Sequence, residues 1–376
     1  MRVLSVNGFI DPVSGGGTAE RTAQLARAMA RAGMQVRVLA TDAGLRASQR
    51  RPDVGRAELS VLPCRNERFL VPRDDGRIER YVREADIVHL CNHWMAINLM
   101  VQRAAQRLGK PYIVCPAGSL SLFGRSKWLK RAYNAFGGRA LVANAAAWVA
   151  ITRLETADFA AYGVDPRRVE VIPNGIEPAD YEQGEARAFR DRFAPGGGRI
   201  VLFVGRLNAI KGPDLLLEAF LSHAPDSSRL VLVGPDGGMR AALEARVRQH
   251  RAGGRVVFAG WLGGADKVAA YRAADLVVVP SRQEAMSLVA LEAGACGKPV
   301  LLTDRCGFDE AAAGGGARVV APDAQALGAA LAELMARASL EQMGERMRHL
   351  VLSEYTWDAA VKRYAALFER VYNPRA

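Results

Sequence analysis

The stretch RIVLFVGRLNAIKGPDLLLEAFL, residues 199–221, decides the fold class of this chain. Its first seven residues form an almost unbroken apolar run that ends in glycine, which is typical of a β-strand buried on both faces. A loop follows, and the apolar positions from Asp214 to Leu221 predict a helix. Strand, loop and helix in this order begin a βαβ unit, and such units build parallel sheets.

The same order of elements recurs along the chain. Runs rich in Val and Leu predict four more strands in the second half: RLVLVG (229–234), RVVF (255–258), DLVVV (275–279) and PVLLT (299–303). The first half opens with a predicted strand (2–6), the loop SGGGT (14–18), a predicted helix (19–32) that Gly33 ends, and a second strand (36–40). The sequence therefore predicts an α/β protein with two Rossmann-like, doubly wound domains.

The segment VIPNGIE (171–177) separates the halves, because Pro-Asn-Gly interrupts any regular element. We expect one domain over residues 1–175 and another over 176–355. Ligands of open α/β sheets bind outside the carboxyl ends of the strands, so both domains would direct their loops into a shared cleft. The last segment, YTWDAAVKRYAALFERVY (355–372), has apolar residues at helical spacing and predicts an amphipathic helix.

Composition narrows the classes of function. The net charge is +12, and residues 1–180 hold 26 basic against 17 acidic side chains, which indicates an anionic partner such as phosphate, acidic lipid or nucleic acid. The five cysteines are odd in number and lack C-x-x-C spacing, so we expect reduced thiols rather than disulfides or a zinc site. No apolar run is long enough to span a bilayer and no secretory signal precedes the first strand, which predicts a cytoplasmic protein.

The loop SGGGT is the first candidate phosphate site. Gly15, Gly16 and Gly17 would let backbone N–H groups crowd an anion at the start of the following helix. A plain flexible turn explains the same residues equally well. The dinucleotide pattern G-x-G-x-x-G is absent directly after the strand, which weakens a dehydrogenase interpretation.

The loop GRLNAIKGPD (205–214) is the second candidate. Arg206 and Lys211 follow the carboxyl end of a strand at Gly205, so both cations could converge on one diphosphate. Only 7 of the 51 basic residues are lysine, and a lysine in this loop therefore indicates a need for a compact ammonium. The alternative is two solvated surface charges.

The stretch PSRQEAMSLVALEAGACGKPV (280–300) is the third candidate. Ser287 is a predicted N-cap, which places Glu284 in the loop before a helix and Glu292 in its second turn. Carboxylates accept hydrogen bonds from sugar hydroxyls, and N–H groups at residues 287–289 could take phosphate oxygens. Taken singly, a favourable helix-dipole contact would explain Glu284 and plain surface exposure would explain Glu292. Together with Arg206 and Lys211 they indicate a nucleotide-sugar site.

These segments together resemble a known family. GGGTAE, IPNGI, GRLNAIKG, LVGPDG and the E-x7-E pattern are similar, in order and spacing over nearly the whole chain, to the retaining glycosyltransferases of family 4, which have the GT-B fold. The final segment, 356–376, looks like the family's last helix, which returns to pack on the first domain.

The resemblance implies roles for the candidate residues. Arg206 and Lys211 would clasp the diphosphate of a nucleoside-diphosphate sugar, Glu292 would hold the ribose and Glu284 would contact the transferred sugar. It implies further donor contacts around Gly205 and from the following residues: Gly15, Gly16, Gly17, Met286, Ser287 and Leu288. It also implies a saccharide or polyprenyl-diphosphate-linked acceptor in polysaccharide or glycolipid assembly, and neither a metal nor a cofactor, because the two cations neutralise the leaving group.

Two positions depart from the family pattern. Many members read E-G-F-G-L where this chain has Glu284-Ala285-Met286-Ser287-Leu288. This difference implies a sugar pocket of a different shape. Members often carry a first-domain histidine where YIVCPAGSL has Ala117.

Histidines close to this position in the sequence offer a replacement on the acceptor side. His93, Trp94 and Ser119 could line the acceptor site; alternatively His89 and His93 pack locally.

The segment GRSKWLKRAYNAFGGR (124–139) interleaves Lys127, Lys130, Arg131 and Arg139 with three aromatic side chains. Leu129, Tyr133 and Phe136 would share one face of a basic amphipathic helix. Such a helix would contact an anionic membrane surface or a lipid diphosphate at the inner face of the cell membrane. A half-buried helix with a charged outer face is the alternative.

Three other functions remain open on the sequence. Net charge alone suggests nucleic-acid binding, but no recognised module occurs and we expect no nucleic-acid partner. A sugar-nucleotide epimerase or phosphorylase would keep the GT-B fold with different chemistry. A non-catalytic sugar-nucleotide binder would explain the missing histidine.

Overall fold

The computed structural model describes residues 1–13, 15–121 and 127–373. The chain divides into two compact units, which are described separately. Unit 1 comprises residues 1–175 and 357–376, and unit 2 comprises residues 176–356.

Unit 1 is built on a seven-stranded sheet in the order β3-β2-β1-β6-β7-β8-β9, and every neighbouring pair is parallel. Its strands are β1 (Arg2–Phe9), β2 (Gln35–Thr41), β3 (Glu58–Leu62), β6 (Ile87–Cys91), β7 (Tyr112–Cys115), β8 (Ala147–Ala150) and β9 (Val169–Val171), with a small antiparallel pair β4 (Cys64–Asn66) and β5 (Val71–Pro72). Its helices are α1 (Gly16–Arg31), α2 (Leu45–Ser48), α3 (Arg77–Glu84), α4 (Ala96–Arg107), α5 (Lys127–Tyr133), a π-helix (Asn134–Gly138), α6 (Arg139–Ala143), 3-10 segments (Leu154–Tyr162, Pro166–Arg168) and α15 (Trp357–Tyr372).

Unit 2 has a six-stranded parallel sheet in the order β12-β11-β10-β13-β14-β15. Its strands are β10 (Ile200–Val204), β11 (Arg229–Val233), β12 (Val256–Gly260), β13 (Leu276–Val279), β14 (Val300–Thr303) and β15 (Ala317–Val320). Its helices are a 3-10 turn (Pro178–Tyr181), α7 (Ala186–Phe193), α8 (Pro213–His223), α9 (Arg240–Gln249), α10 (Gly264–Ala273), α11 (Leu288–Ala295), α12 (Glu310–Ala313), α13 (Ala324–Ala336) and α14 (Glu341–Glu354).

The predicted fold class is confirmed, since both halves are parallel α/β sheets. The apolar runs at 200–204 and 276–279 are central strands that are almost wholly buried, as their continuous patterns indicate. The sequence prediction missed β15, whose residues are only half-buried at the sheet edge, and in unit 1 it named only the strands that form β1 and β2, without β3 and β6 to β9. It also placed the start of α1 at residue 19, whereas the helix begins at Gly16.

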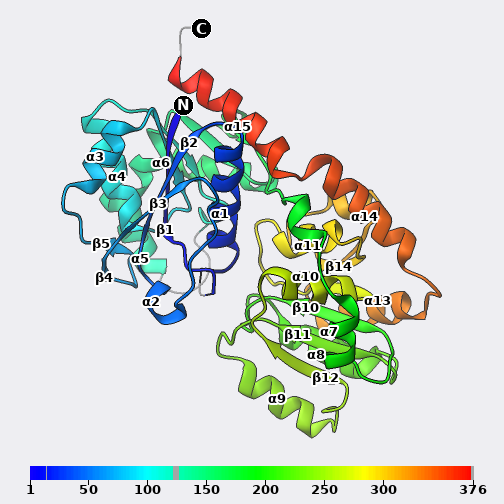
Figure 1. Cartoon of the computed structure of the whole chain (residues 1–376). Helices are drawn as coiled ribbons and strands as arrows, with labels where there is room; N and C mark the ends of the chain where they lie inside the picture. Colours follow the sequence, from blue (N-terminus) through cyan, green and yellow to red (C-terminus); the bar gives the residue numbers. More distant parts are fainter. Residues whose placement is uncertain (14, 122–126, 374–376) are drawn as a thin grey trace. The chain divides into compact units, whose positions relative to one another are not determined.

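Helix α15 lies against α1 inside unit 1 (Figure 1). The Trp357 indole donates to Gln24 Oε1 at 2.6 Å, and the Tyr364 hydroxyl accepts from buried Arg21 at 3.1 Å. The apolar residues of α15 that the sequence placed on one face are all buried: Trp357, Val361, Tyr364, Leu367 and Phe368.

Strand order reverses at one place in each sheet. In unit 2 the chain leaves β10 for β11 on one side and returns to β13 on the other, and in unit 1 the same happens at β1 and β6. The loops after the two strands diverge at such a switch point, and the crevice at their carboxyl ends is where open α/β sheets bind ligands. In unit 2 these loops are GRLNAIKG after β10 and PSRQEAMS after β13.

Candidate functional site

The loops that flank the unit 2 switch point are held together by glycines that permit close backbone contacts. A Cβ on Gly212 would lie 2.1 Å from the Pro280 carbonyl oxygen, and one on Gly234 would lie 1.9 Å from the Gly205 oxygen. Gly212 also has a φ of +66°, which favours glycine. The loops after β10, β11 and β13 therefore form one packed group.

Lys211 and Glu284 meet in this group. Lys211 Nζ lies 2.9 Å from Glu284 Oε1, and the Ser281 hydroxyl donates to Glu284 Oε2 at 2.9 Å. The Lys211 backbone N–H is fixed by Asn208 Oδ1 at 3.0 Å. The Glu284 side chain is 12% exposed and that of Lys211 is 31% exposed, so both remain reachable by a ligand. The sequence predicted these residues separately, and the structure makes them an ion pair.

Arg206 lies in the same group of loops. Its aliphatic carbons pass over Gly237, where an added Cβ would lie 2.8 Å from Arg206 Cγ. The adjoining Asp214 carboxylate is covered by a bidentate contact from Arg282, at 2.9 and 2.7 Å. That second pair ties α8 to the loop after β13 and leaves its charges mutually neutralised.

The loop after β13 leads into α11 as predicted. Ser287 Oγ accepts from the Ala290 N–H at 3.2 Å, which confirms the N-cap. The Ser287 N–H itself donates to the Cys306 carbonyl at 3.1 Å, so of the predicted phosphate donors at 287–289 only those of Leu288 and Val289 have no acceptor among the described residues. Met286 and Leu288 are buried and shape the start of the helix.

Glu292 is buried rather than exposed on the helix surface. Its Oε1 lies 2.8 Å from Lys267 Nζ and its Oε2 accepts from the Tyr271 hydroxyl at 2.5 Å. Burial and the neighbouring Glu292 carboxylate raise the pKa of Tyr271, which keeps the phenol a hydrogen-bond donor. The interpretation of Glu292 as a solvated surface charge is therefore wrong.

In unit 1 the glycine loop is the start of α1. Residue 14 lies outside the described residues. Gly15 is the N-cap and donates its N–H to the Asp11 carbonyl at 2.8 Å, while Gly16 and Gly17 already belong to the first turn. Gly15 therefore cannot offer its N–H to an anion without breaking that turn, and Gly16 and Gly17 keep theirs directed out of the helix end.

The loop after β7 is held by a buried carboxylate. Glu155 accepts from the Gly118 N–H at 2.5 Å and from the Ile151 N–H at 2.8 Å. Burial raises the pKa of Glu155 to about 7. Ala117 has a φ of +50° and Ser119 donates its hydroxyl to the Pro116 carbonyl at 2.6 Å, so Ser119 closes its own turn.

Both first-domain histidines are buried. His89 in β6 packs against Tyr364 with the two rings tilted by 55°, and burial lowers the pKa of His89 to about 3. His93 lies between Trp94 and Tyr133, donates from Nε2 to Asn134 Oδ1 at 3.0 Å, and has a pKa lowered to about 4 by burial. Local packing therefore explains the position of His89. For His93, the contact with Asn134 explains only one of the two ring nitrogens.

The predicted basic helix does not run as one helix. Residues 124–126 lie outside the described residues, α5 spans 127–133, and the π-helix that follows contains Gly137 at a non-helical φ of 138°. Tyr133 turns inward and donates to the His93 carbonyl at 2.6 Å, whereas Phe136 is 78% exposed. The prediction that Tyr133 and Phe136 share a face is therefore wrong.

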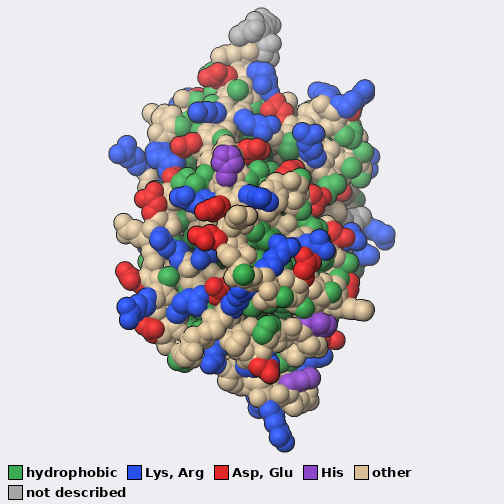
Figure 2. All heavy atoms as spheres, turned by 90° about the vertical axis from the view of Figure 1, so that its right-hand side faces the viewer, with side chains coloured by type: hydrophobic (Ala, Val, Ile, Leu, Met, Phe, Trp, Pro, Cys, Tyr) green, Lys and Arg blue, Asp and Glu red, His purple; other side chains and the backbone are tan. Residues whose placement is uncertain are grey.

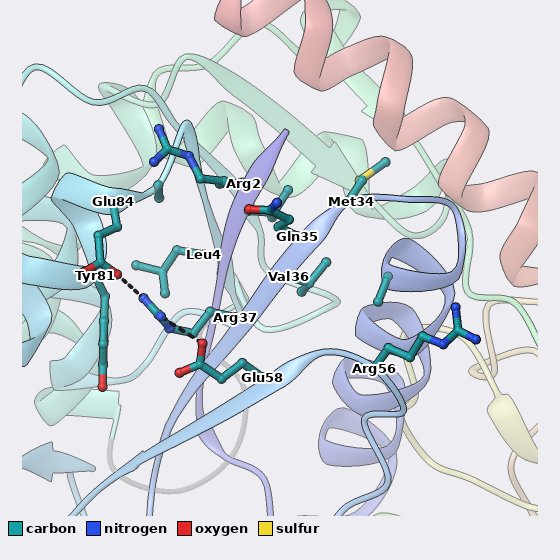
Figure 3. Close-up of a pocket in the computed structure, with 13 residues that line it drawn as sticks. Arg2, Leu4, Met34, Gln35, Val36, Arg37, Arg56, Glu58, Tyr81 and Glu84 are labelled. Atoms are coloured by element: carbon teal, nitrogen blue, oxygen red, sulfur yellow. Dashed lines mark hydrogen bonds and ion pairs between the residues drawn. The ribbon is translucent and has the colours of Figure 1, made fainter.

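A cavity of about 480 Å³ lies at the amino ends of β1, β2 and β3 (Figure 3). Arg37 reaches between Glu58 and Glu84 there, at 2.8 and 2.5 Å, and its guanidinium lies 4.3 Å from the Tyr81 ring centroid. Arg37 at this wall is therefore neutralised by two carboxylates.

Comparison with known proteins identifies the family. The model of the glycosyl transferases group 1 matches residues 185–350, and the model of the glycosyl transferase 4-like domain matches residues 16–175. The chain belongs to the GT-B glycosyltransferases of family 4.

Solved structures of this glycosyltransferase fold align over nearly the whole chain. Anabaena HepE in complex with UDP-glucose has a TM-score of 0.81 at 18% identity and covers 98% of this chain and 99% of its own. WaaG, a glycosyltransferase involved in lipopolysaccharide biosynthesis, has a TM-score of 0.69 at 22% identity and covers 97% of this chain and 99% of its own. These likenesses show the fold.

Curated relatives match parts of this glycosyltransferase. A D-inositol 3-phosphate glycosyltransferase of Acidothermus cellulolyticus is 42% identical over 37% of this chain, and one of Jonesia denitrificans is 34% identical over 62% of it. The matched regions span 34% and 59% of those relatives' own lengths.

Three residues that hold the candidate site or a neighbouring loop escaped the sequence analysis. Lys267 and Tyr271 hold Glu292, and Glu155 holds the loop after β7. Lys267 carried a usable signal, since it is one of only seven lysines, as Lys211 is.

Among the described residues, no helix combines the length and apolar character needed to cross a bilayer.

Proposed function

We propose that the protein transfers a sugar, with retention at the anomeric carbon, from a nucleoside-diphosphate sugar to a hydroxyl of a saccharide or lipid-linked saccharide. The observation that carries the proposal is the ion pair between Lys211 and Glu284 at the switch point of unit 2, 2.9 Å apart and partly exposed. Nucleotide ligands bind open α/β sheets at this position. Anabaena HepE, whose crystal structure is a complex with UDP-glucose, has the same fold.

The diphosphate would lie against Lys211 and Arg206. A lysine ammonium has three N–H donors, and the contact with Glu284 uses one of them. The remaining donors, with the Leu288 and Val289 N–H groups at the start of α11, would stabilise the charge that develops on the leaving diphosphate. These groups supply the neutralisation without a metal ion.

The two glutamates would have separate tasks. Glu284, fixed by Ser281 and Lys211, would accept hydrogen bonds from hydroxyl groups of the transferred sugar. Glu292, in the body of α11, would accept hydrogen bonds from the ribose hydroxyls. Donor specificity would then depend on Ala285, Met286 and Ser287, where the chain departs from the family pattern.

The acceptor would bind unit 1 and could be presented at an anionic membrane surface on the cytoplasmic side. Trp128 is 68% exposed and Phe136 is 78% exposed, and both stand among exposed basic residues: Lys127, Arg131 and Arg139. Exposed aromatic and basic side chains of this kind favour the membrane interface. Figure 2 shows basic and acidic side chains interspersed on the face drawn there, an arrangement that favours a solvated surface over a nucleic-acid groove.

The experiment is a thermal-shift screen of sugar nucleotides followed by product analysis with the best ligand. A ligand that binds only the folded state raises the melting temperature. We expect release of nucleoside diphosphate that depends on a saccharide acceptor, and a product with the donor's anomeric configuration by NMR. An isomerised donor without acceptor would favour the epimerase, and binding without turnover would favour the non-catalytic binder.

Membrane contact has its own test. Flotation with vesicles rich in anionic lipid should carry the protein at moderate salt, and Trp128→Ala with Phe136→Ala should abolish it. No flotation of the unaltered protein would remove the membrane claim.

A further inference from the structure

Helices α10 and α11 are joined by a buried polar group of three side chains. Lys267 and Tyr271 are four residues apart on α10 and so share one face of the helix. Both reach the Glu292 carboxylate on α11, Lys267 at Oε1 and Tyr271 at Oε2, over 2.8 and 2.5 Å. The Glu292 side chain is 5% exposed and that of Lys267 is 19% exposed.

These two contacts occupy half of the hydrogen-bond acceptor positions of the Glu292 carboxylate. An ionised carboxylate has about four acceptor positions, two on each oxygen. Lys267 takes one position on Oε1 and Tyr271 takes one on Oε2, which leaves one on each oxygen. A ribose presents two neighbouring hydroxyl donors, one for each remaining position. A 2′-deoxyribose presents one.

The choice of lysine matters for this geometry. Arginine makes up 44 of the 51 basic residues, and its planar fork tends to cover both carboxylate oxygens. Arg282 does so on Asp214 in the same unit. Lys267 contacts Oε1 alone of the two carboxylate oxygens, which keeps acceptor positions open.

We propose that Lys267 and Tyr271 are positioning residues that hold Glu292 as an acceptor for two hydroxyls and thereby select a ribonucleotide over a 2′-deoxyribonucleotide donor. The inference rests on the proposed function, in which Glu292 accepts the ribose. It differs from a purely structural link between α10 and α11, because such a link would not respond to the number of hydroxyls on the ligand.

The test compares dissociation constants by calorimetry for UDP and 2′-deoxy-UDP, or for the GDP or ADP pair if that base gives the larger thermal shift. A charged hydrogen bond contributes about 1.5–3 kcal/mol, so the unaltered protein should prefer the ribonucleotide by about 10- to 100-fold. Tyr271→Phe and Lys267→Met should each reduce this ratio to about threefold or less. Lys298→Met, a lysine beyond the other end of α11, is the matched control and should keep the ratio.

Two outcomes overturn the inference and are distinguishable. If Glu292→Gln loses the preference while Lys267→Met and Tyr271→Phe keep it, the positioning role is wrong and the ribose contact stands. If Glu292→Gln also keeps the preference, the ribose contact in the proposed function is wrong as well. Circular dichroism checks that each variant folds, and Tyr271→Phe, which removes a single oxygen, is the mildest change if Lys267→Met is unstable.

Discussion

The two switch points of the molecule have the same topology, but different side chains lie at each of them. In unit 2 the loops after β10 and β13 bring together Lys211 and Glu284, both partly exposed. In unit 1 Asn92, after β6, donates to Asn7 near the end of β1 at 3.1 Å, and the buried Asp11 carboxylate after β1 accepts from the Ser48 hydroxyl. Equal folds therefore carry different chemistry.

Under the proposed function this difference assigns the donor to unit 2, because a diphosphate and its sugar need cations and carboxylates in reach. The buried carboxyl group of Glu155 in unit 1 accepts from the backbone N–H groups of Gly118 and Ile151. We therefore expect charge changes in unit 2 to affect donor chemistry and those in unit 1 to affect stability.

The largest effect is expected from Glu284→Gln. The substitution keeps the shape of the side chain but removes the negative charge beside the transferred sugar, and kcat should fall about 100- to 1,000-fold. Initial-rate kinetics measure it, with Glu218→Gln as a control at an exposed pair with Arg246 in the same unit. A kcat within a few fold of the unaltered enzyme would remove Glu284 from the site.

Gly234→Ala should break the packed loops of unit 2. Its Cβ would lie 1.9 Å from the Gly205 oxygen, and its φ of +142° is unfavourable for alanine. We expect the free energy of unfolding to fall by about 3 kcal/mol or more, measured by urea denaturation. Gly253→Ala, where an added Cβ meets nothing within 4 Å, should be neutral. Equal stability of both variants would contradict the close contact.

Glu155 in unit 1 should make stability depend on pH. Burial raises its pKa from 4.5 to about 7, although the nearby Arg21 guanidinium lowers it and Asp158 raises it slightly further. The folded state then holds a proton that the unfolded state releases, so the stabilisation present below pH 4.5 is lost as pH rises to 7.

Glu155→Gln removes this titration. The difference in unfolding free energy between the unaltered protein and the variant should fall by roughly 2–3 kcal/mol from pH 4.5 to 7. Urea denaturation across this range measures it. A difference that stays constant with pH would contradict the raised pKa.

The smallest effect is expected at the cap of α11. Ser287→Ala removes the acceptor of the Ala290 N–H and should cost about 1 kcal/mol in unfolding free energy. Helix α1 of unit 1 has Gly15 as its N-cap, without a side-chain hydrogen bond, so Gly15 offers no equivalent loss. A Ser287→Ala variant as stable as the unaltered protein in thermal unfolding would show that the cap is dispensable.

The sequence predicted the central strands well because strands buried on both faces are continuous apolar runs. It also separated Glu284 from Glu292, since the cap at Ser287 marks where α11 begins. It could not predict the contact from Lys267 to Glu292, because these residues are 25 positions apart and lie on two different helices. Glu155 was missed because its partners are backbone N–H groups, which leave no pattern in the side chains.

The break in the predicted basic helix had a local cause. Helical spacing placed Tyr133 and Phe136 on one face, but Gly137 takes a φ of 138° and the chain forms a π-turn there. A glycine pair inside an amphipathic pattern is a reason to expect a helix end.

The most direct test of the central claim, that Lys211 holds the donor diphosphate, is calorimetric binding of UDP and of uridine to the unaltered protein and to Lys211→Ala, with the matching pair for another base if the screen selects it. The account predicts that Lys211→Ala weakens UDP binding by about 10- to 100-fold and leaves uridine binding within about twofold. UDP binding that is unchanged, or uridine binding that falls equally, would contradict it.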